Sequence, residues 1–277
     1  MNRPLVALII NRATTLVYPE LLPELVGDLQ ERGFRVVLSL IELESNVDQA
    51  LAGLEGARLD GIIAAARPSD AALRRAARAS VPLLLYNCHA PLTASVSCDH
   101  AACGRHLVEL LLDGGHRRFG LIAGPQDSLV ARERLQGALQ AMTPPQVLTC
   151  EVAQGDYSYD SGMRALDALV AQMKPKPSAV IAMNDAMALG ALDRARTLRV
   201  RVPRDLSVVG IDGISLARLP VYELATMRQP LTRMAAAAAE MMNVRISEPG
   251  LPAEARLFAG ELIRGCTARF ERPRRPN

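Results

Sequence analysis

Residues Ala179-Val-Ile-Ala-Met183 lead into Asn184-Asp185, and Ser207-Val-Val-Gly-Ile211 leads into Asp212-Gly213. Each short apolar run has the length and composition of a buried parallel strand, and a small polar residue follows each run at once. In open α/β sheets, ligands are held in the crevice beyond the carboxyl ends of the strands. These two segments therefore predict an α/β fold with a ligand site at one edge of a sheet.

The same alternation of apolar runs and helical patterns extends along most of the 277-residue chain. Strands are expected at 5–10, 34–40, 61–66, 81–86, 119–123, 147–152, 179–183 and 206–211. Each gap can hold a helix, which is typical of strand–helix units around a parallel sheet. After Asp212 the alternation stops, and we expect an extended piece over 222–228, a long helix from Leu231 and a last extended segment after a loop at 248–254. Gly33 and Gly115 are expected to end helices.

The composition is that of a globular protein, with 49% hydrophobic and 22% charged residues. A net charge of +3 does not by itself indicate nucleic-acid binding. Five cysteines without a CxxC pair favour a reducing compartment, and the sequence has neither a signal peptide nor an apolar stretch of transmembrane length. We therefore expect a cytoplasmic protein that does not insert into a membrane.

Common catalytic and nucleotide-binding motifs are absent from the sequence. It contains no GxGxxG, GxxxxGK, GxSxG or HExxH pattern, so the motifs that usually identify nucleotide-binding proteins and hydrolases are missing. The four histidines lack metal-ligand spacing, and Cys98, His100 and Cys103 can be drawn as a metal cluster, but three such residues near a helix start more often have no such role. We expect no catalytic site, no metal and no cofactor.

Two loops after predicted strands carry arginine or tyrosine. Arg132 and Arg134 are expected in the first turns of the helix after strand 119–123, where an arginine can bind vicinal hydroxyls or simply face solvent. Tyr157 follows strand 147–152, and its ring can form a stacking wall or only cover its loop. Both interpretations remain open for each residue.

The two opening segments have ordinary interpretations as well. Either Asn184 or Asp185 is expected to be a helix N-cap, and Asp212 can equally be a turn residue. The argument for a site comes from convergence, because Ser128, Arg134, Tyr157, Asn184 and Asp212 all lie just beyond strands of one predicted sheet. Such a cluster suits a polyhydroxylated ligand and contains no obvious nucleophile–base pair.

Eight segments, in order, resemble the effector-binding core of LacI/GalR-type transcription regulators over residues 4–270. They are Tyr18-Pro-Glu-Leu-Leu, Leu59-Asp-Gly-Ile-Ile63, Asp99 with Gly115-His-Arg-Arg118, Ala123-Gly-Pro to Arg134-x-x-Gly137, Gly155-Asp-Tyr, Asn184-Asp-x-Met-Ala-x-Gly-Ala191, Val202-Pro-x-Asp-Leu-Ser-Val-Val-Gly-x-Asp212 and Thr226-Met-Arg-Gln-Pro230. Single segments are generic, but eight in this order are specific.

The resemblance implies a type I periplasmic-binding-protein-like fold of two similar lobes, each a parallel sheet flanked by helices. The N-terminal lobe is expected at 1–97 plus 230–254 and the C-terminal lobe at 98–229 plus 255–270, with 271–277 as a tail. Crossings between the lobes are expected near 95–99, 213–218 and 227–231.

The resemblance also implies roles for individual residues. Arg134 would bind effector hydroxyls, Tyr157 would stack, Asn184 and Asp212 would hydrogen-bond the ligand, and Ser128 would line the pocket. Gln229 would lie at a crossing, Asn87 would contribute from the other lobe, and the loop 12–18, including Tyr18, would form the remaining wall. An Arg134→Ala substitution is expected to abolish ligand stabilisation and leave the melting temperature of the free protein nearly unchanged.

The implied function is that of a sensing core that binds a small, sugar-like effector and relays this to DNA. Such regulators act as homodimers and contact operator DNA through an N-terminal helix-turn-helix head, whereas this chain starts at the first core strand. It is expected to be either a truncated form or a stand-alone domain. Gly213, where a second acid commonly follows Asp212, and Ala64-Ala65-Ala66, where a polar residue is usual, depart from the pattern of a sugar site. The alternative function is a solute-binding receptor of a transport system.

Overall fold

The computed structural model describes residues 3–271, which form two compact units. Unit 1 comprises Met1–Cys98 and Pro230–Phe258, and unit 2 comprises Asp99–Gln229 and Ala259–Asn277. The chain therefore passes between units at 98/99, 229/230 and 258/259. The prediction of a crossing at 213–218 was wrong, because these residues lie within unit 2. The assignment of 255–258 to the C-terminal lobe was also wrong, because these residues form a strand of the unit 1 sheet.

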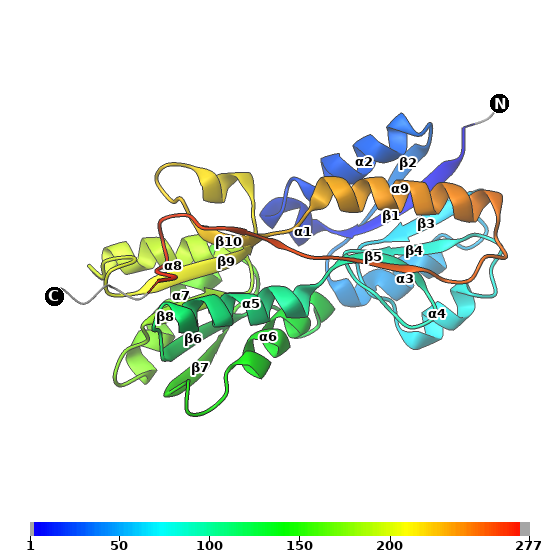
Figure 1. The fold of residues 1–277 in the computed structure, drawn as a ribbon. Coiled ribbons are helices and arrows are strands. Elements are labelled where there is room, and N and C mark those ends of the chain that lie inside the picture. The colour runs from blue at the N-terminus through cyan, green and yellow to red at the C-terminus, as the bar shows by residue number, and fades with distance from the viewer. Residues whose placement is uncertain (1–2, 272–277) are drawn as a thin grey trace. The chain divides into compact units, whose positions relative to one another are not determined.

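Unit 1 is a six-stranded sheet with helices on both faces (Figure 1). Its strands are β1 (Leu5–Asn11), β2 (Arg35–Ile41), β3 (Gly61–Ala64), β4 (Leu83–Tyr86), β5 (Ala94–Cys98) and β11 (Ala255–Phe258), in the order β11-β5-β4-β3-β1-β2, and all pairs are parallel. Its helices are α1 (Arg12–Val17), α2 (Leu21–Glu31), α3 (Val47–Gly53), α4 (Asp70–Ala76) and α9 (Leu231–Ser247), with a 3₁₀ turn η1 (Glu44–Asn46). Helices α2 and α9 pack together on one face, and α3 and α4 cover the other.

Unit 2 repeats this plan. Its strands are β6 (Arg118–Ala123), β7 (Thr149–Gln154), β8 (Ala179–Ala182), β9 (Ser207–Asp212), β10 (Ala225–Arg228) and β12 (Glu261–Ile263), in the order β12-β10-β9-β8-β6-β7, with β12 alone antiparallel. Its helices are α5 (His100–Asp113), α6 (Leu129–Ala141), α7 (Tyr159–Gln172) and α8 (Asp185–Thr197), with a 3₁₀ turn η2 (Ser215–Arg218). Helices α5 and α6 pack as one pair and α7 and α8 as another (Figure 1).

The predicted parallel α/β architecture is confirmed. All eight predicted strands occur within a few residues of their expected bounds, and the extended pieces near 222–228 and after 254 are β10, β11 and β12. The buried face of α9 includes the predicted set Leu231, Met234, Ala235, Ala238, Met241 and Met242. Gly33 and Gly115 have φ of +88° and +86°, as expected for residues that end helices.

Two segments differ from the expectation. The strand β5 was not predicted, because serines interrupt the apolar residues in its sequence, Ala-Ser-Val-Ser-Cys. In the structure all five residues are buried. Residues 12–17, expected as part of a loop, form the helix α1, and Tyr18 follows it as a buried residue. This segment contains no helix-breaking residue before Pro19, which explains why it continues as helix.

Two glycines bring α5 and α6 into backbone contact. A Cβ at Gly104 of α5 would overlap the carbonyl oxygen of Arg134, and one at Gly137 of α6 would overlap the carbonyl oxygen of Ala101. Each helix therefore supplies a glycine at the point where the other helix's backbone is closest. This contact fixes the backbone of Arg134 against α5.

Among residues 3–271, no helix combines the length and apolar composition required to cross a bilayer.

Candidate functional site

An ion pair between Arg134 and Asp212 lies at the centre of the candidate site, in unit 2. Asp212 ends β9, and Arg134 lies in the second turn of α6, which begins beyond the carboxyl end of β6. The Arg134 Nη2 donates to Asp212 Oδ1 at 2.7 Å, and the two residues are only 2% and 4% exposed. Burial alone would lower the pKa of Arg134, but the Asp212 carboxylate outweighs it and the pKa is raised.

Two other nitrogens of Arg134 also donate to the protein. Nη1 donates to the carbonyl oxygen of Met183 at 2.6 Å, and Nε lies 3.3 Å from His100 Nδ1, which accepts. A guanidinium has five N–H groups, so two have no partner among residues 3–271 and could serve a ligand. Arg134 therefore joins α5, the end of β8 and the end of β9, in addition to any contact with a ligand.

Gln229 completes this centre from the end of β10. Its Nε2 donates to Asp212 Oδ1 at 2.8 Å, and its backbone N–H donates to the Asp212 carbonyl at 3.1 Å. Its Oε1 is buried and accepts no hydrogen bond from the described residues. An unsatisfied buried acceptor costs about 1–3 kcal/mol, so a ligand N–H or O–H that donated to it would bind favourably.

Asn184 is the N-cap of α8 and also holds the Tyr157 loop. Its Oδ1 accepts from the N–H of Met187 at 2.9 Å, and its Nδ2 donates to the Tyr157 carbonyl at 3.0 Å. The half-buried Tyr157 ring packs against Gly124, where a Cβ would overlap it. The cap therefore positions the predicted stacking residue.

Asp185 anchors the turn that follows Asp212. Its carboxylate accepts from the N–H groups of Gly213 and Ile214, at 2.7 and 3.0 Å, and from the Thr226 hydroxyl at 2.6 Å. Burial, and then the negative charge of Asp212, raise the pKa of Asp185 to about 7 against the opposing effect of these three donors. Sequence reasoning left Asn184 and Asp185 interchangeable, whereas the structure gives them different roles.

Three of the predicted ligand residues have left-handed backbone. Asn87, Tyr157 and Asp212 have φ of +58°, +71° and +137°. Non-glycine residues adopt such values rarely, and they gather at functional sites where the surrounding structure holds them. Asn and Asp adopt this backbone more readily than other non-glycine residues, so the sequence carries a weak signal at Asn87 and Asp212 and none at Tyr157.

The eight predicted residues divide into groups. Hydrogen bonds link Arg134, Asp212 and Gln229 directly, and the bond to Met183 places this group beside Asn184 and Tyr157. Ser128 is fully buried as the N-cap of α6, its Oγ accepting from the Ala131 N–H. Asn87 and Tyr18 lie in unit 1, where Asn87 follows β4 and donates its N–H to the Val96 carbonyl. Arg132 is exposed and donates to the carbonyl of Gln126.

His100, drawn with Cys98 and Cys103 as a metal cluster and then set aside, accepts a hydrogen bond from Arg134. Among residues 3–271 no group of three His, Cys, Asp or Glu side chains is arranged to hold a metal. The expectation that Arg134→Ala would leave the free protein's melting temperature unchanged is inconsistent with the geometry, because the substitution would strand a buried carboxylate.

Comparison with known proteins agrees with this fold. A family model described as "Periplasmic binding protein-like domain" matches residues 108–267. The HTH-type transcriptional repressor CytR of Escherichia coli K12 is 32% identical over 221 residues, which covers 76% of this chain and 63% of that protein. The regulator CelR of Thermobifida fusca is 32% identical over 228 residues, covering 79% and 66%.

Solved structures lead to the same group. A LacI transcriptional regulator from a Rhodococcus species has a TM-score of 0.85 at 28% identity, covering 97% of this chain and 100% of that one. A complex of CelR with cellobiose has a TM-score of 0.84 at 28% identity, covering 96% and 85%.

The chain therefore belongs to the periplasmic binding protein-like family. Within it, the chain has the core of LacI-type transcription regulators, so the resemblance found in the sequence is confirmed. These relatives are named as regulators rather than enzymes, and the chain spans less than two thirds of the length of the CytR repressor.

Proposed function

We propose that this chain is the sensing core of a transcription regulator and binds a small polyhydroxylated effector, a sugar or sugar derivative, at the carboxyl edge of the unit 2 sheet. The observation that carries the proposal is the buried centre of Arg134, Asp212 and Gln229. It offers two unused N–H groups on Arg134 and the unsatisfied Gln229 Oε1. A hydroxyl both accepts and donates, so neighbouring hydroxyls on one ligand match this pair of groups.

The remaining predicted residues would complete the recognition. Tyr157 has the apolar ring face on which a sugar ring stacks, and Asn184 fixes its loop. We assign Ser128 to the lining of the same site, and the ligand roles of Asn87 and Tyr18, which lie in unit 1, stay predictions. The cellobiose bound by the relative CelR supports the ligand class, although it is a property of that protein.

The proposed output is a change in DNA binding. An effector would shift the equilibrium between two conformations by as much as its affinity for them differs, and a DNA-binding head like those of the HTH-type relatives would respond at the operator. Such a role places the protein in the cytoplasm, in keeping with its free cysteines.

We further propose that the chain forms a homodimer. The edge strand β2 and the turn after it expose the side chains of Val37, Leu38, Leu40 and Leu43, which are 43–58% accessible. An exposed apolar row on an edge strand is a common feature of protein–protein interfaces.

The ligand assignment is tested by a thermal-shift screen of sugars, including cellobiose, sugar acids and nucleosides, followed by calorimetry on each hit. Arg134→Lys keeps the charge beside Asp212 but loses the planar fork, so a hit's affinity should fall at least about tenfold. Arg132→Lys, two residues away on the exposed face of α6, is the matched control and should bind as the parent does. Equal affinity in the Arg134→Lys protein would show that the ligand binds elsewhere.

A further inference from the structure

Unit 1 contains a cavity of about 350 Å³ at the amino ends of β3 and β4. Its floor is the sheet, where Ile62 of β3 and Leu83 of β4 are paired in register. The end of α3 with the turn after it forms one wall, and α4 with the segment that follows it forms the other. The predicted ligand residue Asn87 lies beyond the opposite, carboxyl end of β4. The cavity is therefore a separate feature from the candidate site.

The lining of the cavity is mostly apolar. On one wall, Ala72 and Ala76 of α4 are too small to fill the space above the sheet. On the other wall, Leu51, Leu54 and Leu59 are only half-buried. Apolar atoms make up most of the lining that remains accessible. The cavity thus leaves apolar surface in water, and the apolar body of a ligand would cover that surface favourably.

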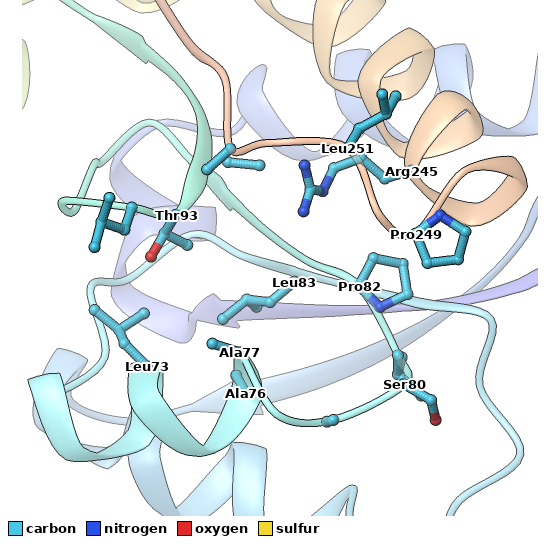
Figure 2. Close-up of a pocket in the computed structure, with 15 residues that line it drawn as sticks. Leu73, Ala76, Ala77, Ser80, Pro82, Leu83, Thr93, Arg245, Pro249 and Leu251 are labelled. Atoms are coloured by element: carbon cyan, nitrogen blue, oxygen red, sulfur yellow. The ribbon is translucent and has the colours of Figure 1, made fainter.

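A second hollow shares part of one wall with this cavity (Figure 2). Ala76 and Leu83 border both, whereas Ala77 borders only the second hollow. Figure 2 shows the second hollow, which also has Pro249 and Leu251 in its lining. Its accessible lining is more polar than apolar, so an apolar ligand favours the cavity above β3 and β4.

Two charged side chains of opposite sign lie among the fourteen described residues that line the cavity. Glu55 belongs to the turn after α3, and Arg75 to the last turn of α4. Both side chains are exposed. Within residues 3–271 they form no ion pair, with each other or with a third residue, and neither side chain makes a hydrogen bond. One carboxylate and one guanidinium therefore border the same apolar cavity without binding each other.

This combination of groups matches one class of small molecule. A carboxylate accepts hydrogen bonds from an ammonium group, and a guanidinium donates two parallel hydrogen bonds to a carboxylate. An α-amino acid carries an ammonium and a carboxylate on one carbon, whereas a ligand with a single charge would bring a like charge to Glu55 or to Arg75. The volume is close to the lower limit of small-molecule pockets, about 300 Å³, so the ligand is limited to a single side chain.

We infer that this cavity is a second small-molecule site, which binds a single apolar α-amino acid. The ammonium group would pair with Glu55 and the carboxylate with Arg75, and the side chain would lie on Ile62 and Leu83. Burial of the side chain supplies most of the affinity, because exposed ion pairs contribute little. The two charges supply the selectivity for a zwitterion.

The probe for this site is 4-fluoro-L-phenylalanine, whose binding to the 277-residue chain is followed by fluorine NMR at low ionic strength. The expected dissociation constant is about 1 mM. Two analogues each lack one charge: 3-(4-fluorophenyl)propanoate has no ammonium, and 2-(4-fluorophenyl)ethylamine has no carboxylate. Each should bind at least about threefold more weakly, because it loses one exposed ion pair and keeps the repulsion from the other side chain.

Charge variants assign each group of the probe to its partner. Glu55→Gln should weaken the amino acid about threefold but should not weaken the propanoate, which has no ammonium to lose. Arg75→Gln should weaken the amino acid by about the same factor but should not weaken the amine. Arg74→Gln removes an exposed arginine of α4 that does not line the cavity, and this matched control should bind as the parent does.

Size variants locate the apolar body of the probe. Ala76→Leu places a larger side chain in the cavity and should weaken binding at least about tenfold. Ala77→Leu makes the same change at the next residue of the chain, which borders only the second hollow, and should leave binding unchanged. Thermal unfolding by circular dichroism verifies that both proteins are folded at the temperature of the measurement.

Each of the following results would overturn the proposal. The amino acid shows no binding at about 10 mM; either analogue binds as tightly as the amino acid; or the Glu55→Gln and Arg75→Gln proteins bind all three compounds as the parent does. Weaker binding in Ala77→Leu with full binding in Ala76→Leu would place the probe in the second hollow, and a loss confined to the Arg134→Lys protein would place it in the unit 2 site.

Discussion

Replacing Arg134 by methionine should destabilise unit 2 by about 3–5 kcal/mol, the cost of leaving one partner of a buried ion pair without the other. Methionine fills much of the volume but donates no hydrogen bond. Asp212, 4% exposed, would lose the charge that lies 2.7 Å from its Oδ1, and the Met183 carbonyl and His100 Nδ1 would lose their donor. Each kcal/mol lowers the melting temperature of a unit of this size by roughly 2–4 °C. We expect a fall of roughly 6–20 °C.

Thermal unfolding followed by circular dichroism measures this effect, since the chain has no tryptophan for fluorescence. Arg132→Met on the same helix removes an exposed arginine and should change the stability by no more than about 1 kcal/mol. The double variant Arg134→Met, Asp212→Asn removes the stranded charge and should recover at least about 2 kcal/mol relative to Arg134→Met alone. If Arg134→Met costs no more than Arg132→Met, or if Asp212→Asn adds to its cost, the buried pair does not hold the site together.

Two further predictions concern titration and helix packing. Between about pH 4 and 7 the folded state retains the proton of Asp185, whose pKa burial and the Asp212 charge raise to about 7, so this residue makes stability fall as pH rises. His116 has the opposite sign, because burial and then the positive charge of Arg269 lower its pKa to about 4 and stability is lost as pH falls from about 6.5 to 4. The free energy of unfolding can be measured by urea titration at several pH values between 4.5 and 6.5. Relative to the parent, its slope against pH should become more positive in Asp185→Asn and more negative in His116→Gln, by up to about 1.4 kcal/mol per pH unit each. Slopes equal to that of the parent would contradict both assignments. In the same assay, Gly104→Ala should cost about 1–3 kcal/mol, because its Cβ would overlap the α6 backbone. Gly27→Ala in α2, which has open space around it, should instead stabilise by about 0.5–1 kcal/mol, and equal effects of the two substitutions would refute the close helix contact.

The sheet could be predicted from sequence because its central strands are continuous apolar runs. Ala179–Ala182 and Ser207–Asp212 are buried along their whole length, which is the pattern of parallel strands covered on both faces. The strand Ala94–Cys98 is equally buried but is built with two serines, and its burial depends on the neighbouring strands β4 and β11. Periodicity within the segment carries no information about those neighbours.

The positions of the site residues could be predicted, but their bonds could not. Polar residues after strands must gather at one edge of a parallel sheet, which is why Arg134, Asn184 and Asp212 were found from the sequence. The direction of the side chains decides whether Asn184 or Asp185 caps the helix. His100 accepts a hydrogen bond from Arg134 only because α5 and α6 are in contact. Both features depend on the tertiary structure, and the spacing of residues in the sequence does not predict them.

The bonds of the buried pair have a mechanical consequence. Arg134 is tied to His100, the second residue of unit 2, and Asp212 is tied to Gln229, the last residue before the chain passes into unit 1 at Pro230. One ion pair is thus the common anchor of two of the three segments that leave the unit. A displacement of either segment can therefore reach the other through this pair of side chains, and a molecule that weakens the pair affects both segments.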